Sequence, residues 1–151
     1  MIGILNLQAA NKVAQYAGPG GWNDPDMLEV GNGKMTFNEY YAHFALWCLL
    51  KAPLLIGCSL ENVSDQTLEI LGNEELIAIN QDSLGVQGVR VRPENEPGNH
   101  EVWSGPLSDD RTAVIFLNKD TESAKISIDI KTELKLDYPT YLVRDVISHE
   151  D

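Results

Sequence analysis

Two aspartates stand two positions apart in a stretch rich in glycine and proline. Residues 18–32 read GPGGWNDPDMLEVGN, in which Asp24 and Asp26 flank Pro25. On an extended chain, residues two apart point to the same face, so these carboxylates could bind a hard cation or act as an acid/base pair. Turn hydrogen bonds from Asn23 and Asp24 to backbone amides explain the stretch equally simply. Taken alone, the sequence favours the turn.

Other arrangements that support catalysis or ligand binding are weak. The glycines around Pro19 could cradle a phosphate, but the sequence has neither a Walker lysine nor a GxGxxG pattern. No serine lies in a GxSxG context, and the histidines are scattered at positions 43, 100 and 149, so no Ser-His-Asp triad is indicated. The residues point to no metal site and no cofactor.

The charge and hydropathy patterns exclude several classes of partner. The 151 residues carry a formal net charge of −12, and the basic residues do not cluster. This charge argues against nucleic acids and anionic membrane surfaces as partners, because both require clustered Lys and Arg. No apolar stretch is long enough to span a bilayer.

Two features depend on the cellular compartment. Cys48 and Cys58 both lie in apolar runs, which favours buried free thiols over a disulfide. Asn62-Val63-Ser64 is a weak N-glycosylation motif that matters only in the secretory pathway. The first residues show no secretory signal.

The first half of the chain alternates helix-like and strand-like segments. Helices are expected over residues 4–16, from the N-cap Thr36 (with Glu39 completing a capping box) to before Pro53, from the N-cap Ser64 to Gly72, and from the N-cap Asn73 to about Asn80. Strands are expected over residues 27–30 and 54–58. This order is typical of a parallel α/β sheet or barrel, yet two strands cannot close a barrel.

The second half reads differently. Alternating segments are separated by turn residues, including Pro93–Gly98, and predict strands over residues 89–92, 101–104, 112–117, 125–130 and 140–143. Such spacing indicates a thin antiparallel sandwich. The chain is therefore divided into an α/β part, residues 1–87, and an all-β part, residues 88–151.

Three segments together resemble a known family. They are YAGPGGWNDPDMLEVGNG at 16–33, LWCLLKAPLLIGCSL at 46–60 and ELIAINQDSLGVQG at 75–88. They closely resemble the plant-type α-galactosidases of glycoside hydrolase family 27. The resemblance implies a (β/α)8 TIM barrel followed by an antiparallel β-sandwich. Residues 1–87 would be the C-terminal part of the barrel and residues 88–151 an incomplete sandwich.

The resemblance also assigns roles to the glycine-rich stretch. Met27 would pack against bound galactose, and Asp26 would lie beside the sugar and shape the site. Trp22, Asn23 and Asp24 would hold the loop. The paired aspartates would thus support the site and would not be the catalytic pair. No cofactor is implied, and the ligands would be α-galactoside oligosaccharides or glycoconjugates. Family members are secreted, bound to the cell wall, vacuolar or lysosomal.

The same resemblance separates the family's activity from that of this chain. Family members are retaining glycosidases that use one aspartate as nucleophile and another as general acid/base. The nucleophile lies in a Tyr-Asp-Asn-Cys-like motif and the acid/base follows a Trp-Arg pair. Neither motif occurs in this sequence. The isolated chain is therefore expected not to hydrolyse glycosides.

Two alternatives remain open at this point. An α-N-acetylgalactosaminidase would share the same loop, because the residues that read the sugar's 2-position lie upstream in the family. A non-catalytic carbohydrate-binding module would need exposed aromatic side chains on the β half, for which Trp103, Tyr138 and Tyr141 are the candidates.

Overall fold

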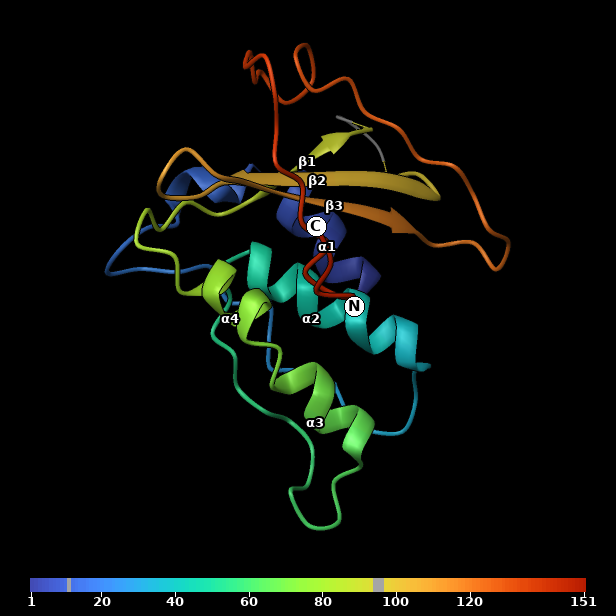
Figure 1. Cartoon of the computed structure of the whole chain (residues 1–151). Coiled ribbons are helices and arrows are strands. Elements are labelled where there is room, and N and C mark those ends of the chain that lie inside the picture. Colours follow the sequence, from blue (N-terminus) through green and yellow to red (C-terminus); the bar gives the residue numbers. More distant parts are fainter. Residues whose placement is uncertain (11, 94–96) are drawn as a thin grey trace.

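The computed structural model describes residues 1–10, 12–93 and 97–151. The helices are α1 (Ile2–Ala10), the 3-10 helix η1 (Val13–Tyr16), α2 (Phe37–Leu49), α3 (Asp65–Leu71) and α4 (Glu74–Asn80). The strands are β1 (Val89–Arg92), β2 (His100–Pro106) and β3 (Thr112–Asn118). Figure 1 shows the three-stranded sheet lying above α1 and α2, with α3 and α4 on the other side of α2. The chain after β3 crosses the outer face of the sheet and returns to the helices.

Side-chain caps explain where three helices begin. Thr36 Oγ1 accepts from the backbone N–H of Glu39, whose carboxylate accepts from the N–H of Thr36 at 2.7 Å, so the predicted capping box is confirmed. Ser64 and Asn73 cap α3 and α4 as predicted. The expected single helix over residues 4–16 was wrong. Here α1 ends at Ala10, and Lys12 adopts a left-handed conformation with φ of 50° before η1 begins.

The two predicted strands of the first half shrink to a single parallel bridge between Leu28 and Ile56. The N–H of Leu28 donates to Leu55 O at 2.8 Å, and the N–H of Gly57 donates to Leu28 O at 3.1 Å. The parallel direction was predicted correctly, but the predicted strand lengths were wrong. Among the described residues each of these segments has only the other as a β partner, and two short parallel segments form few ladder hydrogen bonds.

The sheet is antiparallel with the order β1-β2-β3, and the three strands agree with the predicted segments. Trp103 pairs with Arg90 on one side and with Ile115 on the other. Its ring is fully buried, and its Nε1–H donates to Glu101 Oε2 at 3.0 Å. Glu101 also binds Arg90 and Lys119. Trp103 is thus a core residue and is removed from the set of aromatic side chains that could stack on a sugar.

The strands expected over residues 125–130 and 140–143 were wrong, since neither segment forms a strand in the described structure. The alternation that suggested the first one is real, because Ile126 and Ile128 are half-buried while Lys125 and Ser127 are exposed. A strand also requires a partner for its backbone groups. The ladder hydrogen bonds of β3 go to β2, and no other described strand lies beside residues 125–130. The predicted turn at Pro93–Gly98 lies partly outside the described residues.

The core is centred on α2, whose residues from Tyr40 to Leu49 are all buried except Ala42. Leu28 and Val30 pack on it from the glycine-rich stretch, and Leu5 packs on it from α1. Both cysteines are free thiols, but only Cys48 is buried and Cys58 is half-buried. Burial raises the pKa of the Cys48 thiol to about 12, so this thiol is inert.

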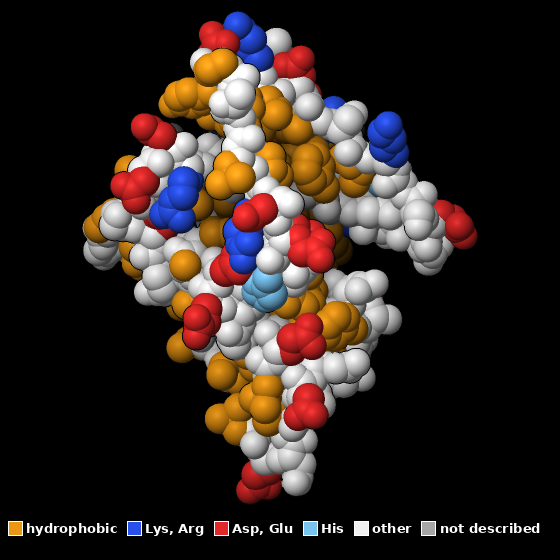
Figure 2. Space-filling model, in the orientation of Figure 1, with side chains coloured by type: hydrophobic (Ala, Val, Ile, Leu, Met, Phe, Trp, Pro, Cys, Tyr) orange, Lys and Arg blue, Asp and Glu red, His pale blue; other side chains and the backbone are white. Residues whose placement is uncertain are grey.

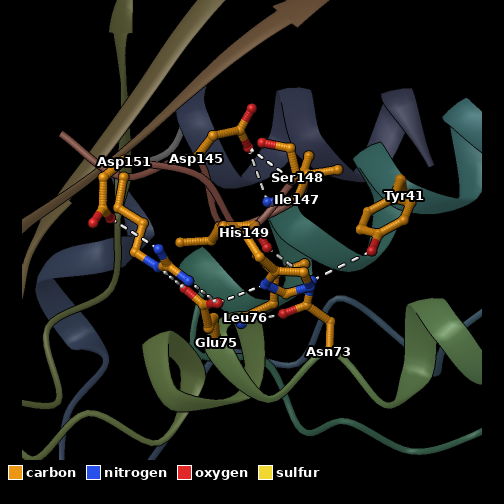
Figure 3. A network of polar contacts seen from close by, with 11 residues as sticks. Tyr41, Asn73, Glu75, Leu76, Asp145, Ile147, Ser148, His149 and Asp151 are labelled. Carbon is orange, nitrogen blue, oxygen red and sulfur yellow. Dashed lines mark hydrogen bonds and ion pairs between the residues drawn. The ribbon is translucent and has the colours of Figure 1, made fainter.

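A polar network fastens the C-terminal residues to α4, as Figure 3 shows. Arg144 forms a bidentate pair with Glu75 at 2.7 and 3.0 Å and also binds Asp151 at 2.8 Å. Asn73 Nδ2 donates to Val146 O at 2.9 Å. The Arg144 guanidinium, together with His149, lowers the pKa of the Glu75 carboxyl to about 2. These contacts explain why an irregular segment keeps a defined position.

Apolar side chains remain on the surface. Figure 2 shows hydrophobic atoms among the charged ones over the segment that follows β3, where Leu142 is 88% exposed and Val143 is 70% exposed. Near the parallel bridge, Leu55 and Ile56 are also largely exposed. Exposed apolar surface next to an unpaired strand edge favours association with another polypeptide. No helix among the described residues has the length and hydropathy needed to cross a bilayer.

Candidate functional site

The carboxylates of Asp24 and Asp26 are engaged in the turn that contains them. Asp24 Oδ1 accepts from the backbone N–H of Asp26 at 2.9 Å, and Asp26 Oδ1 accepts from the N–H of Met27 at 2.8 Å. Asp26 has a φ of 79°, so the chain is not extended here. The extended conformation on which the carboxylate-pair hypothesis rested was therefore wrong. The Asp24 contact is the turn hydrogen bond that the alternative predicted.

Asn23 makes a different contact from the one expected. Its Nδ2 donates to Val13 O and to Gln87 Oε1, both at 2.8 Å. Gln87 is buried and its Nε2 donates to Gln8 Oε1 at 3.1 Å. The side chain thus connects the loop to η1, α1 and the segment before β1. Residues far apart in sequence supply these partners, so local turn chemistry could not reveal them.

Two aromatic side chains of α2 form hydrogen bonds with the backbone of the loop. Trp47 Nε1–H donates to the backbone carbonyl of Asp26 at 2.7 Å, and His43 Nε2 accepts from the N–H of Glu29 at 2.9 Å. Their ring centroids lie 4.0 Å apart, because residues four apart share one face of a helix. These contacts fix the backbone on both sides of Met27. Their i, i+4 spacing was visible in the sequence, but the loop as their partner was not.

His43 is neutral in this position. It is 1% exposed, and burial lowers its pKa to about 4. Because Nε2 accepts a hydrogen bond, the proton of the neutral ring resides on Nδ1. That Nδ1 atom has no hydrogen-bond partner among the described residues.

Met27 leads into the parallel bridge and presents its side chain to solvent. It is 48% exposed, whereas its neighbour Leu28 is 1% exposed. Gly57 makes room for this arrangement. A Cβ at residue 57 would collide with the carbonyl oxygen of Leu28 and would lie 3.1 Å from Met27 Sδ. An exposed thioether on a fixed backbone can pack against an apolar ligand surface.

The structure does not bring all the candidate residues together. Asp24 and Asp26 line a hollow of about 330 Å³ beside α1, together with Ile4, Leu7, Gln8, Val13 and Pro25. Trp22 lines a separate hollow of about 240 Å³ that includes Lys51 and Asp82. Met27 lines neither of these two. Asn62 lies elsewhere, on an exposed turn before α3. No group of three His, Cys, Asp or Glu in the described parts of the chain could hold a metal ion.

Sequence comparison matches both parts of the chain. Residues 2–82 match the family described as alpha galactosidase A, and residues 97–151 match the alpha galactosidase C-terminal beta sandwich domain. The chain therefore belongs to the α-galactosidase family, glycoside hydrolase family 27, and corresponds to its C-terminal part. It combines part of the catalytic barrel with part of the β-sandwich, as the resemblance implied.

Individual relatives agree with this family. The chain is 51% identical over 143 residues to alpha-galactosidase 3 of Arabidopsis thaliana, covering 91% of this chain and 32% of that protein. The crystal structure of alpha-galactosidase I from Mortierella vinacea superposes with a TM-score of 0.82 at 37% identity, covering 93% and 36% of the two chains. The α-galactosidase of Saccharomyces cerevisiae, solved with raffinose, gives 0.79 at 35% identity, covering 92% and 32%. The chain thus spans about a third of the length of these relatives.

Proposed function

We propose that this chain forms part of an α-galactosidase that hydrolyses terminal, non-reducing α-D-galactosyl residues. Its family and the names of its relatives support this activity, and one relative was solved with the α-galactoside raffinose. The substrates would be α-galactoside oligosaccharides or glycoconjugates. We further propose that the protein enters the secretory pathway, as family members do, and reaches the cell wall, vacuole, lysosome or cell exterior.

In this proposal the loop from Trp22 to Met27 forms one wall of the galactose site. The exposure of Met27 on a fixed backbone carries the assignment, since its thioether can pack against the apolar face of a sugar ring. Asp26 shapes the wall, because its carboxylate holds the N–H of Met27. Trp22, Asn23 and Asp24 support the loop. The contacts of Asn23 and Asp24 are consistent with that role.

The reaction itself needs two carboxylates that this sequence does not supply. A retaining glycosidase places a nucleophile and a general acid/base on opposite sides of the scissile bond, about 5–5.5 Å apart. The two aspartates of the glycine-rich loop each accept a hydrogen bond from a backbone N–H of their own turn. This arrangement fits residues that support the loop better than a nucleophile that attacks the sugar. The 151-residue chain by itself would therefore be inactive, and the remainder of a barrel would complete the site.

A chimera tests the proposal directly. This chain would replace the matching C-terminal third of alpha-galactosidase 3 of Arabidopsis thaliana, to which it is 51% identical. We expect hydrolysis of p-nitrophenyl α-D-galactopyranoside by the chimera. Met27→Ala should lower kcat/KM by roughly three- to tenfold, because fully burying a Met side chain contributes about 1.5–3 kcal/mol and Met27, at 48% exposed, has only about half of its surface left to bury.

The control is Leu142→Ala, which truncates an apolar side chain that is 88% exposed in the C-terminal segment. It should leave kcat/KM unchanged. A folded chimera without activity would contradict the proposed function. Equal effects of the two truncations would contradict the role assigned to Met27.

A further inference from the structure

The sequence contains one Asn-X-Ser/Thr motif, Asn62-Val63-Ser64, which plays no part in the proposed hydrolysis. It lies between the parallel bridge at Ile56 and the start of α3 at Asp65. Figure 1 shows this connection as the loop that projects furthest from the sheet, beneath α3. None of the residues lining the two hollows described above belongs to it.

The local geometry suits the attachment of a bulky polar group. Asn62 has a φ of 57°, a left-handed turn conformation that asparagine adopts more readily than most residues. Its side chain is exposed and forms no hydrogen bond within the described residues. The preceding turn is held by the N–H of Glu61, which donates to Ser59 Oγ at 3.2 Å. A glycan on Asn62 Nδ2 would therefore project into solvent and displace no contact.

We propose that Asn62 is an N-glycosylation site, used when the chain enters the secretory pathway. In that reaction an oligosaccharide is transferred from its lipid pyrophosphate carrier to the side-chain amide nitrogen. A C–N bond forms, the amide loses a proton and the lipid pyrophosphate leaves. The site requires the amide of Asn62 and the hydroxyl of Ser64 together.

The role of Ser64 in the fold determines when this can occur. Its Oγ accepts from the N–H of Thr67 at 3.2 Å and lies 3.0 Å from Thr67 Oγ1, so the folded chain uses the hydroxyl as the N-cap of α3. The transferase must bind the same hydroxyl. The glycan is therefore added to the nascent chain, before α3 forms.

The experiment is expression of the chain behind a cleavable signal peptide in eukaryotic cells, followed by digestion of the whole-cell lysate with peptide-N-glycosidase. Because addition precedes folding, a chain that fails to fold is still scored. The original chain and Ser64→Thr should each lose the mass of a single N-glycan. Asn62→Gln should show no shift.

Ser64→Asp is the matched control, because aspartate is an effective N-cap but destroys the motif. It should keep α3 and lose the glycan. Folded chain purified from bacteria should remain unmodified when it is incubated with the transferase and its lipid-linked oligosaccharide donor, whereas the same chain unfolded in advance should be modified; modification of the folded chain would contradict the timing. The proposal is overturned if the original chain shows no shift while a secreted glycoprotein in the same cells is modified. None of these measurements depends on galactoside hydrolysis.

Discussion

Asp24 Oδ1 accepts a hydrogen bond from the backbone N–H of Asp26 at 2.9 Å, so the first aspartate of the pair holds the backbone of the second. Asp26 repeats the arrangement one residue further on, with its carboxylate on the N–H of Met27. The side chain that results from these two contacts is an exposed methionine at a fixed place. Asp24 and Asp26, whose spacing resembles that of a catalytic pair, thus hydrogen-bond to the backbone of their own loop.

Removing the Asp24 acceptor should therefore weaken the turn. Asp24→Ala leaves the N–H of Asp26 without its partner and should lower the free energy of unfolding by about 0.5–1 kcal/mol. Asp24→Asn keeps an oxygen at the Oδ1 position and should be close to neutral. Urea unfolding followed by tryptophan fluorescence measures both. Equal losses in the two variants would mean that the charge of Asp24 matters and its hydrogen bond does not.

Gly57 offers a steric test of the contact between the parallel bridge and Met27. Gly57→Ala places a Cβ against the carbonyl oxygen of Leu28 and should cost about 1–3 kcal/mol, as overpacking usually does. Gly21→Ala is the control, since a Cβ there has nothing within 4 Å. The two melting temperatures measure the difference. Equal stability of both variants would contradict the close approach of residue 57 to Leu28.

The buried His43 predicts a pH dependence with a definite sign. Its pKa is about 4 in the folded chain and about 6.5 when unfolded, so the unfolded state gains protons first as pH falls. The stability that the neutral, buried His43 provides is present in full above about pH 6.5 and is lost progressively as the pH falls to about 4. On this basis it amounts to roughly 3 kcal/mol.

Comparing urea midpoints near pH 7 and near pH 4.5 measures this loss. His43→Gln serves as the reference, because its amide oxygen can still accept from the N–H of Glu29 but does not titrate. The variant should lose less stability over this range than the original chain. The same loss in both would show that other groups cause the acid sensitivity.

The network in Figure 3 predicts how the C-terminal residues detach. Arg144→Met removes the pair with Glu75 and the contact to Asp151, and chymotrypsin should then cleave the segment near Tyr141 faster. Lys131→Met removes an exposed pair with Asp137 outside the network and is the control. Identical cleavage rates for the two variants would show that Arg144 does not hold the segment.

Local chemistry predicted much of the helical framework. Thr36, Ser64 and Asn73 mark helix starts because a cap depends on residues only three positions apart. The three strands around Trp103 were likewise predictable. Each lies in one of the alternating segments of the second half, and each pairs with a strand that is next to it in the sequence. Residues 125–130 have the same alternation without a partner strand, and alternation alone does not report whether a partner is present.

The site was less predictable for a related reason. The contacts that hold its loop come from α2 and from Gln87, which are remote in sequence. The left-handed φ of Asp26 breaks the extended conformation on which simple alternation depends. Only the resemblance to a family pointed to Met27, since an exposed methionine has no chemical signature of its own.

The most direct test of these roles is the initial rate of p-nitrophenyl α-D-galactopyranoside hydrolysis by the purified 151-residue chain. If Asp24 and Asp26 support the loop and the catalytic carboxylates are not among these residues, the chain has no nucleophile and no general acid/base. The prediction is then a rate equal to that of buffer alone. Turnover by the chain that disappears in Asp26→Asn, which preserves an acceptor for the N–H of Met27, would contradict it and make Asp26 a catalytic residue.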